Sequence, residues 1–295
     1  MRIGVDLGGT KIEIAALDRD GAFAVRERQA SPVGDYNATV RVIRDLVLAA
    51  EAKLGLTCTV GIGIPGAISP ATGLVKNANS TWLNGRPLDR DLATALGRSV
   101  RIANDANCFA LSEAIDGAGH GKRVVFGVIL GTGVGGGVAV DGRILTGPNA
   151  IAGEWGHNPL PWAAPDELPG PPCYCGKSGC IETWLSGPAL KAQGGDDAPS
   201  LARRAENGDA TAEAALTAYE RRLAKALAHL INILDPDAVV LGGGLSNLER
   251  LYANVQPLIR AHAFSDAIAT PILKNRWGDS GGVRGAAWLW PETPA

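Results

Sequence analysis

The sequence predicts an α/β fold made of two similar halves that face each other across a cleft. A strand, a glycine-rich turn and a second strand occur near residue 8, and the same unit recurs near residue 134. Each unit is followed by further strands and helices, the alternation that α/β layers produce. The repeat lies in the pattern of elements and not in residue-by-residue identity.

Length and composition limit the function classes. A chain of 295 residues suits one large or two medium domains. A net charge of -2 gives no bulk attraction to nucleic acid or to an anionic membrane. The first residues lack the apolar region of a signal peptide, and no apolar stretch approaches the roughly 20 residues of a membrane helix. We therefore expect a cytoplasmic protein with neither nucleic acid nor membrane as a partner.

The first half is expected to begin with a hairpin and a further strand. Apolar and small residues alternate over the three predicted strands, and Gly8 and Gly9 supply the turn between the first two. A 3.6-residue apolar stripe then predicts a helix over Tyr36–Leu54. Buried strands are expected next, the second one running into a short helix. These elements cover residues 1–7, 11–17, 23–28, 36–54, 60–64, 100–103 and about 105–114.

The second half repeats the pattern with longer helices. A strand is expected to run into a glycine turn over 131–137, and a short strand follows. Leucines on one face predict a long amphipathic helix over Thr211–Leu234. The remaining expected elements are strands at 123–130, 138–140 and 238–241, a polar loop at 158–172, and a helix at 285–290.

Three glycine clusters are candidates for a phosphate site. In Asp6–Lys11 the backbone N–H groups and the Thr10 hydroxyl could hold ATP phosphates while Asp6 orients a hydrated magnesium ion, although an ordinary hairpin tip explains the turn equally well. Five glycines within 131–137 are costly in chain entropy, which favours close approach of a phosphate over a merely flexible loop. The third cluster, which includes Gly243, could lie beside the adenosine.

Asn104 and Asp105 follow a strand and begin a helix, a position where α/β proteins bind ligands. Asp105 could accept the proton of an attacking hydroxyl. Both residue types also favour helix caps, and from position alone a cap is the better explanation. The polar run 77–82, which includes Asn79 and ends in a tryptophan, suits either hydroxyl recognition with stacking on a sugar or a plain surface loop.

One histidine and three cysteines predict a structural zinc site. His157 precedes the compact frame C-x-C-G-x-x-G-C at 173–180, and one imidazole with three thiolates completes a tetrahedron. A group of reduced cysteines is the alternative. The expected ligands are His157, Cys173, Cys175 and Cys180. Glu182 would be held rigidly beside this knot, although a lone glutamate is by default a surface residue.

These motifs together resemble the ROK family of sugar kinases along nearly the whole chain. They are VDLGGTK at 5–11, GIGIPG at 61–66, NDAN at 104–107, GTGVGGG at 131–137, EWGHNPL at 154–160, CYCGKSGCIE at 173–182 and LGGG at 241–244. The segments 75–85, 102–108 and 152–162 and the ending SGGVRGAAWLW are most similar to bacterial fructokinases (mannofructokinases). The N-acetylglucosamine kinases of the family look similar but less close.

The resemblance implies a role for each site residue. Asp105 looks like the catalytic base, and the sugar ligands would be Asn79, Asn104, Glu154, His157 and Glu182. One ring nitrogen of His157 would bind zinc and the other would face the sugar. The ATP-phosphate residues would be Gly4, Val5, Asp6, Leu7, Gly8, Gly9, Thr10 and Lys11, with Gly131, Thr132, Gly133, Val134, Gly135, Gly136, Gly137 and Val138.

The resemblance implies two lobes of the ribonuclease-H/actin-like kind. Residues 1–115 with a C-terminal helix in 281–295 would form the small lobe, and 116–280 the large lobe with the zinc knot. The expected activity is ATP- and magnesium-dependent phosphorylation of the 6-hydroxyl of a hexose, fructose before mannose or glucose. N-acetylglucosamine kinase or glucokinase is the alternative, and a homodimer is possible. A sugar-binding repressor would need a helix-turn-helix before residue 2, and an actin-like ATPase would lack the knot.

Overall fold

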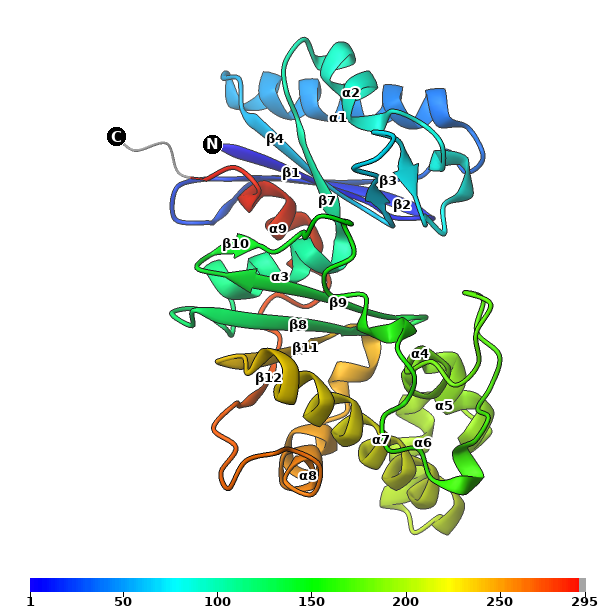
Figure 1. Ribbon diagram of the computed structural model, residues 1–295. Helices are drawn as coiled ribbons and strands as arrows, with labels where there is room; N and C mark the ends of the chain where they lie inside the picture. The colour runs from blue at the N-terminus through cyan, green and yellow to red at the C-terminus, as the bar shows by residue number, and fades with distance from the viewer. Residues whose placement is uncertain (292–295) are drawn as a thin grey trace.

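The computed structural model describes residues 1–291, so residues 292–295 of the expected C-terminal segment lie outside the described part (Figure 1). Two five-stranded sheets lie one above the other, with helices α3 (Asp105–Ile115) and α9 (Gly281–Trp288) between them. Further helices cover the outer face of each sheet. The layered arrangement confirms the predicted two-lobed α/β fold.

The first sheet has the strand order β3-β2-β1-β4-β7. Strands β1 (Arg2–Leu7), β2 (Lys11–Leu17) and β3 (Phe23–Ala30) pair antiparallel, whereas β4 (Thr59–Ile64) and β7 (Arg101–Asn104) continue the sheet parallel to β1. The central strands are apolar on both faces because helices cover them from both sides. The carboxyl ends of β1, β4 and β7 therefore meet at one edge of the sheet.

The second sheet repeats this connectivity in the order β10-β9-β8-β11-β12. Strands β8 (Val124–Leu130), β9 (Val134–Val140) and β10 (Arg143–Ile144) are antiparallel neighbours. Strands β11 (Ala238–Gly242) and β12 (Ile272–Lys274) then extend the sheet parallel to β8. A hairpin followed by parallel strands occurs in both halves, which confirms the duplication expected from the glycine turns.

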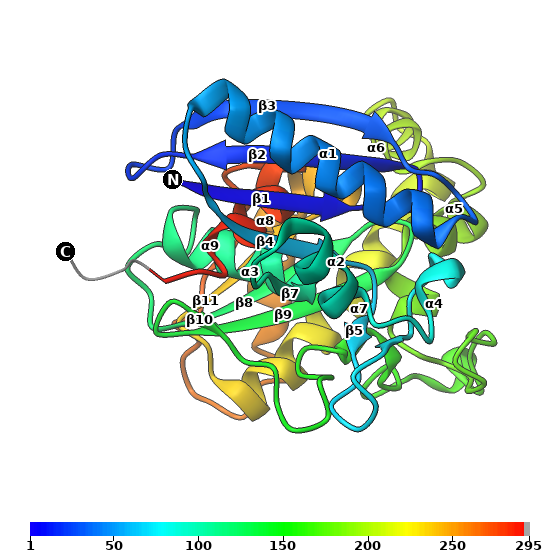
Figure 2. The same ribbon diagram turned by 90° about the horizontal axis from the view of Figure 1, so that it is seen from above.

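Helices α1 (Tyr36–Leu54) and α2 (Leu88–Leu96) cover the outer face of the first sheet (Figure 2). Asp35 caps α1 by accepting from the Ala38 N–H at 2.9 Å, and Gly55 ends it at φ 67°. The helix has the predicted bounds because both caps and the apolar stripe are local signals.

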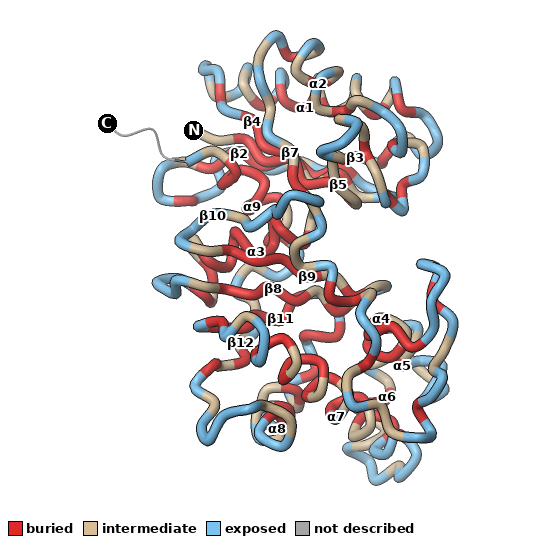
Figure 3. Tube along the Cα trace, in the orientation of Figure 1, coloured by how far each residue is buried: buried red, intermediate tan, exposed pale blue. Residues whose placement is uncertain are grey.

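The outer face of the second sheet carries the longer helices. Helix α7 (Ala210–Leu234) buries the predicted leucine face, and α8 (Arg250–Ile259) lies beside it. Helices α4 (Glu182–Leu185), α5 (Gly187–Gly194) and α6 (Ala198–Glu206) pack at one end of this layer. Figure 3 shows the buried residues concentrated in the two sheets and the helix faces that meet them.

The central helices are held by close backbone contacts that only glycine permits. A Cβ atom on Gly285 of α9 would lie 1.6 Å from the carbonyl oxygen of Cys108 in α3. Cβ atoms on Gly4 and Gly61 would lie 1.9 Å from carbonyl oxygens of α9. Helix α9 therefore packs directly onto the backbones of α3 and of the first sheet.

Two expectations about the chain were wrong. The turn predicted over 131–137 ends at Gly133, because Val134–Val140 forms β9 with its glycines inside the strand. The last helix begins at Gly281 instead of 285 and ends at Trp288. The lobe boundary at residue 115 stays a prediction, and α3 contacts strands of both sheets. Within residues 1–291, no helix combines the length and apolar character needed to cross a membrane.

Candidate active site

Asp105 begins α3 at the carboxyl edge of the first sheet. Asn104 is the cap, since its side chain accepts from the N–H groups of Ala106 at 2.9 Å and Asn107 at 3.3 Å. The Asn104 amide also donates to the Gly66 carbonyl at 3.2 Å. With Asn104 as the cap, the carboxylate of Asp105 accepts from the neighbouring Ala106 N–H, at 2.8 Å, and does not reach the later N–H groups of the first turn. The alternative that Asp105 merely caps the helix is therefore not supported.

Burial, together with the charge of Glu154, raises the pKa of Asp105 to about 6. Burial likewise raises the pKa of Asp6 to about 7, with a contribution from the charge of Asp105. Asp6 belongs to β1 and Asp105 begins α3. A cluster of carboxylates with raised pKa values is typical of sites that move protons or hold cations.

The first glycine turn exposes only part of its predicted phosphate site. The Gly8 N–H donates to the Lys11 carbonyl at 2.9 Å, and Gly9, Thr10 and Lys11 are exposed. The earlier members of the set, Gly4, Val5 and Leu7, lie in the interior of the first sheet. These residues form the sheet beneath the turn. The absence of a side chain at Gly4 allows α9 to pack against the sheet.

The second glycine turn is shorter than predicted, and it contacts the knot segment. The Val134 N–H donates to a carboxylate oxygen of Glu182 at 2.9 Å, and a Cβ on Gly133 would lie 2.6 Å from that oxygen. Thr132 is the exposed residue of the turn, between the half-buried Gly131 and Gly133.

The glycines of β9 have packing reasons of their own. A Cβ on Gly136 would lie 2.6 Å from the Trp155 ring, and one on Gly137 would lie 2.4 Å from the Ala106 carbonyl oxygen. Gly135 also faces Ala106, at 3.3 Å, and Val138 lies in the core. These glycines let α3 and the 153–155 segment pack closely against the sheet. The glycine pattern in the sequence could not distinguish this packing role from a phosphate-binding loop.

The third cluster follows β11, as predicted. Gly243 is exposed with φ 80°, and a Cβ there would lie 2.4 Å from the Leu130 carbonyl oxygen. The position therefore needs glycine for its backbone alone.

The predicted metal ligands come together. The ligand atoms of His157, Cys173, Cys175 and Cys180 all lie within 4.8 Å of one another. Cys173 Sγ is 3.6 Å from His157 Nδ1, and Cys175 Sγ is 3.6 Å from Cys180 Sγ. Zinc bonds of about 2.0–2.3 Å place tetrahedral ligands roughly 3.5–3.8 Å apart, whereas a disulfide needs about 2.05 Å. The donor set and its spacing fit a closed zinc site.

His157 presents its second ring nitrogen to a residue that the motif analysis did not single out. Nε2 lies 2.9 Å from the hydroxyl of Tyr174, whose ring meets the imidazole edge-on at 5.0 Å. The side chain of Tyr174 is otherwise 83% exposed. Tyr174 therefore lies beside a predicted sugar ligand. Its position between Cys173 and Cys175 is the feature of the sequence that could have indicated this.

The predicted sugar loop, residues 77–82, belongs to the first half of the protein. Asn79 is exposed, and the side chain of Asn84 braces the loop through 2.9 Å bonds to the N–H and the carbonyl of Ala78. The expectation that Trp82 stacks on a sugar is not met, because its ring packs into the first core and its Nε1 donates to Thr39. Lys76, at the start of this loop, donates to the Asn149 carbonyl of the second half at 2.7 Å.

Comparisons with known proteins agree with this arrangement. The model of the ROK family matches residues 2–293. The chain is 42% identical over 299 aligned positions to an N-acetyl-D-glucosamine kinase of Yersinia pseudotuberculosis, with 98% of each chain covered.

Among solved structures it is similar to a ROK hexokinase from Thermus thermophilus, with a TM-score of 0.86, 30% identity, and 98% and 97% coverage. It is also similar to a ROK family glucokinase from Streptomyces griseus in complex with glucose and AMPPNP, with a TM-score of 0.77, 28% identity and 98% coverage of both. The resemblance to fructokinases, by contrast, finds no support in these relatives. The chain belongs to the ROK family.

Proposed function

We propose that this protein is an ATP-dependent kinase that phosphorylates the 6-hydroxyl of N-acetyl-D-glucosamine. The observation that carries the proposal is the 42% identity to an N-acetyl-D-glucosamine kinase over nearly the full length of both chains. It favours the alternative sugar of the sequence analysis over fructose. The segments that resemble fructokinases include Asn104, Asp105, Glu154 and His157, whose proposed roles serve any sugar of the family, so these segments discriminate poorly between sugars.

In the proposed reaction Asp105 takes the proton of the sugar hydroxyl as its oxygen attacks the γ-phosphorus. A bond forms between that oxygen and phosphorus, the bond to the β,γ-bridging oxygen breaks, and ADP leaves with the electron pair. A carboxylate whose pKa is raised to about 6 is still ionised near neutral pH and is a better proton acceptor than an ordinary aspartate.

The remaining roles follow from where the side chains lie. Asn104, Glu154, His157, Glu182 and Asn79 are proposed to hold sugar hydroxyls. The backbone of the two turns, Gly8–Lys11 and Gly131–Gly133, is proposed to hold the phosphates, with Gly243 near the adenosine and Asp6 orienting hydrated magnesium.

The zinc site is proposed to be structural. Zinc held by His157, Cys173, Cys175 and Cys180 has no open position, so it would supply rigidity rather than an activated water. Binding through Nδ1 leaves the proton of His157 on Nε2, where it is available to a hydroxyl acceptor. The knot also carries Glu182, which reaches the second glycine turn.

The experiment is a coupled assay of ADP release with N-acetylglucosamine, fructose, mannose and glucose, with Asp105→Asn as the inactive control. We expect the highest kcat/KM for N-acetylglucosamine and a 6-phosphate product by ³¹P NMR. A higher kcat/KM for fructose would restore the fructokinase assignment. Absence of sugar-dependent ADP release with every sugar would refute the kinase proposal itself. A sedimentation run on the same preparation tests the predicted homodimer.

A further inference from the structure

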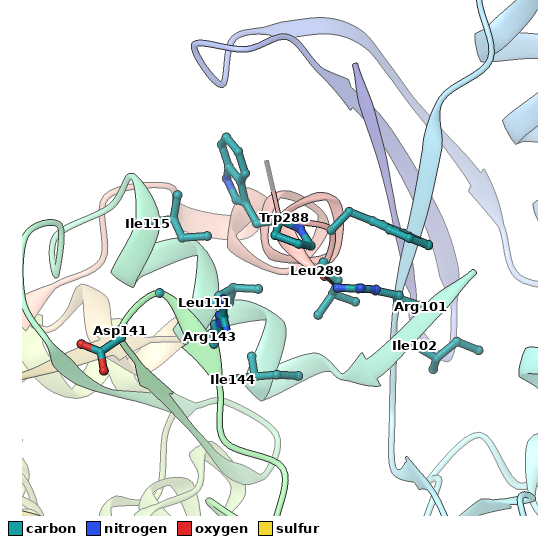
Figure 4. A pocket seen from close by; sticks show the side chains of 12 residues that line it. Arg101, Ile102, Leu111, Ile115, Asp141, Arg143, Ile144, Trp288 and Leu289 are labelled. Atoms are coloured by element: carbon teal, nitrogen blue, oxygen red, sulfur yellow. Dashed lines mark hydrogen bonds between the residues drawn. The ribbon is translucent and has the colours of Figure 1, made fainter. Parts of the chain in front are cut away.

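A cavity of about 760 Å³ lies away from Asp105, where the edges of the two sheets approach each other (Figure 4). Its walls come from the edge strands β7 and β10, the end of α3, and the residues that close α9. Ligand sites of small molecules have volumes of about 300–1,000 Å³. The cavity is therefore large enough for a drug-sized molecule, and both halves of the protein contribute to it.

The two central helices run from this cavity to the proposed catalytic carboxylates. Leu111 and Ile115 of α3 line the cavity, while Asp105 begins the same helix. Trp288 lines it at the end of α9, and a Cβ on Gly282 at the start of that helix would lie 3.1 Å from an Asp6 carboxylate oxygen. A short helix moves nearly as a rigid rod, so displacement at one end reaches the other.

The two helices also move together, because no side chain separates them at their crossing. A Cβ on Gly285 would lie 1.6 Å from the Cys108 carbonyl oxygen. Backbone-to-backbone packing of this kind leaves little room for one helix to slide on the other.

The lining favours one class of ligand. Most of the wall is aliphatic or aromatic, with Ile144 and Trp290 among its members. The side chain of Arg143 is exposed where it lines the cavity (Figure 4), and among residues 1–291 this side chain has no hydrogen bond or ion pair. Arg101 already donates to the Leu289 carbonyl at 2.6 Å and lies over the Trp290 ring.

The acidic residue of the wall does not cancel this charge. Asp141 faces Arg123 outside the cavity, at 3.8 Å. The cavity therefore combines an apolar wall with one unpaired guanidinium, which complements an apolar molecule carrying a single anionic group.

We propose that this cavity is an effector site for a small aromatic monoanion, and that its occupant is coupled to the active site through α3 and α9. Binding would fix the separation of β7 and β10, and with it the angle between the two halves. Only the coupling rests on the proposed kinase function, since binding at the cavity does not require it.

The first test uses 1-anilinonaphthalene-8-sulfonate, whose fluorescence rises in apolar surroundings. We expect saturable binding by the full-length protein without substrates. Arg143→Ala should weaken it roughly fivefold or more, the scale of a lost charge-assisted contact. Arg260→Ala removes an exposed arginine elsewhere and should leave the affinity unchanged. Ile144→Asp should also weaken binding, because its carboxylate would repel the probe's sulfonate from the apolar wall. Equal affinities for the Arg143 and Arg260 variants, or unimpaired binding by Ile144→Asp, would overturn the site.

The second test measures coupling. If the probe changes the Kd of N-acetylglucosamine in calorimetry, the sugar must change the probe's Kd by the same factor, and Arg143→Ala must reduce the effect at a fixed probe concentration. An unchanged sugar Kd at saturating probe would overturn the coupling. Whether the sugar binds at all tests the kinase proposal separately. A variant ending at Pro291 checks the other occupant, the chain's own last four residues. Much tighter probe binding by that variant would assign the cavity to this segment instead.

Discussion

At the scale of single residues, the proposed chemistry depends on carboxylates whose pKa is raised by burial, Asp105 above all. Asp105 gains its raised pKa first from burial and then from Glu154, which lies nearly 50 positions further along the chain. Asn104 takes over the capping of α3 and leaves Asp105 available for proton transfer. Two adjacent residues that look interchangeable in the sequence therefore have different roles.

Replacing Asp105 by asparagine is expected to lower kcat by roughly a hundredfold or more, the scale of a lost general base. ATP affinity should stay near that of the wild type, because the exposed glycine turns do not depend on this carboxylate. Steady-state kinetics with a separate nucleotide titration checks both values. A variant with near-normal kcat would leave Asp105 without a catalytic role.

The same carboxylate predicts how activity depends on pH. Because Asp105 must be ionised to accept a proton and its pKa is about 6, kcat/KM should fall as the pH drops through 6 instead of through 4. The pKa of Asp105 is near 4 in the unfolded chain and about 6 in the folded protein. The folded state therefore loses stability as the pH rises from about 4 to about 6. Asp105→Asn should therefore raise the melting temperature at pH 8 and have little effect at pH 4. An acid limb near pH 4, or no gain in stability at pH 8, would contradict this assignment.

At the scale of elements, the zinc knot is connected to both substrate regions. His157 and Tyr174 face the proposed sugar side, while Glu182 accepts from the Val134 N–H at the second glycine turn. The knot and the second glycine turn are well separated in the sequence. The observed contact implies that damage to the knot also reaches the nucleotide side.

Replacing Cys175 by serine is expected to abolish zinc binding and to lower the melting temperature, because metal binding is coupled to folding. The KM for the sugar should rise strongly, and ATP affinity should fall by a smaller factor through Glu182. Elemental analysis and separate titrations of sugar and nucleotide measure these effects, with Cys58→Ser as a control cysteine outside the cluster. Zinc loss with an unchanged sugar KM would show that the knot stabilises the fold without affecting sugar binding.

The crossing of α3 and α9 predicts where a single methyl group is costly. Gly285→Ala would place Cβ 1.6 Å from a backbone oxygen, so the two helices must separate, and overpacking of this kind costs about 1–3 kcal/mol or more. Gly244→Ala meets no atom within 4 Å and should be nearly neutral. Chemical denaturation compares the two. Equal free energies of unfolding would show that the helix contact is not tight.

At the scale of the whole molecule, a hydrogen bond bridges the two halves on the proposed sugar side. Lys76 begins the predicted sugar loop, and its Nζ donates to the Asn149 carbonyl in the segment that leads to Glu154. Asn77 and Ala150, the next residues on each side, both have positive φ. The bond therefore joins two tightly turned segments that each carry proposed sugar ligands.

Replacing Lys76 by alanine is expected to raise the sugar KM about two- to fivefold, the scale of an exposed charge-assisted bond, with little change in ATP affinity or melting temperature. Asn149→Ala retains the backbone carbonyl that accepts from Lys76 and should behave like the wild type. This control distinguishes an effect of the hydrogen bond from an effect of the Asn149 side chain. Lys76→Arg should restore most of the affinity. Equal KM values for Lys76→Ala and the wild type would leave the contact without a role in binding.

The sequence by itself determined the elements and clusters whose signals are local. Helix α1 has both caps and its apolar stripe within one segment, and the zinc ligands are specified by spacing within a short stretch. Only the tertiary structure decided which glycines approach a side chain of the knot segment and which admit another backbone, as Gly133 and Gly137 show. It also decided the raised pKa of Asp105 and the cavity between β7 and β10. The reason is physical: steric space, burial and charge act between neighbours in space, and those neighbours come from distant parts of the chain.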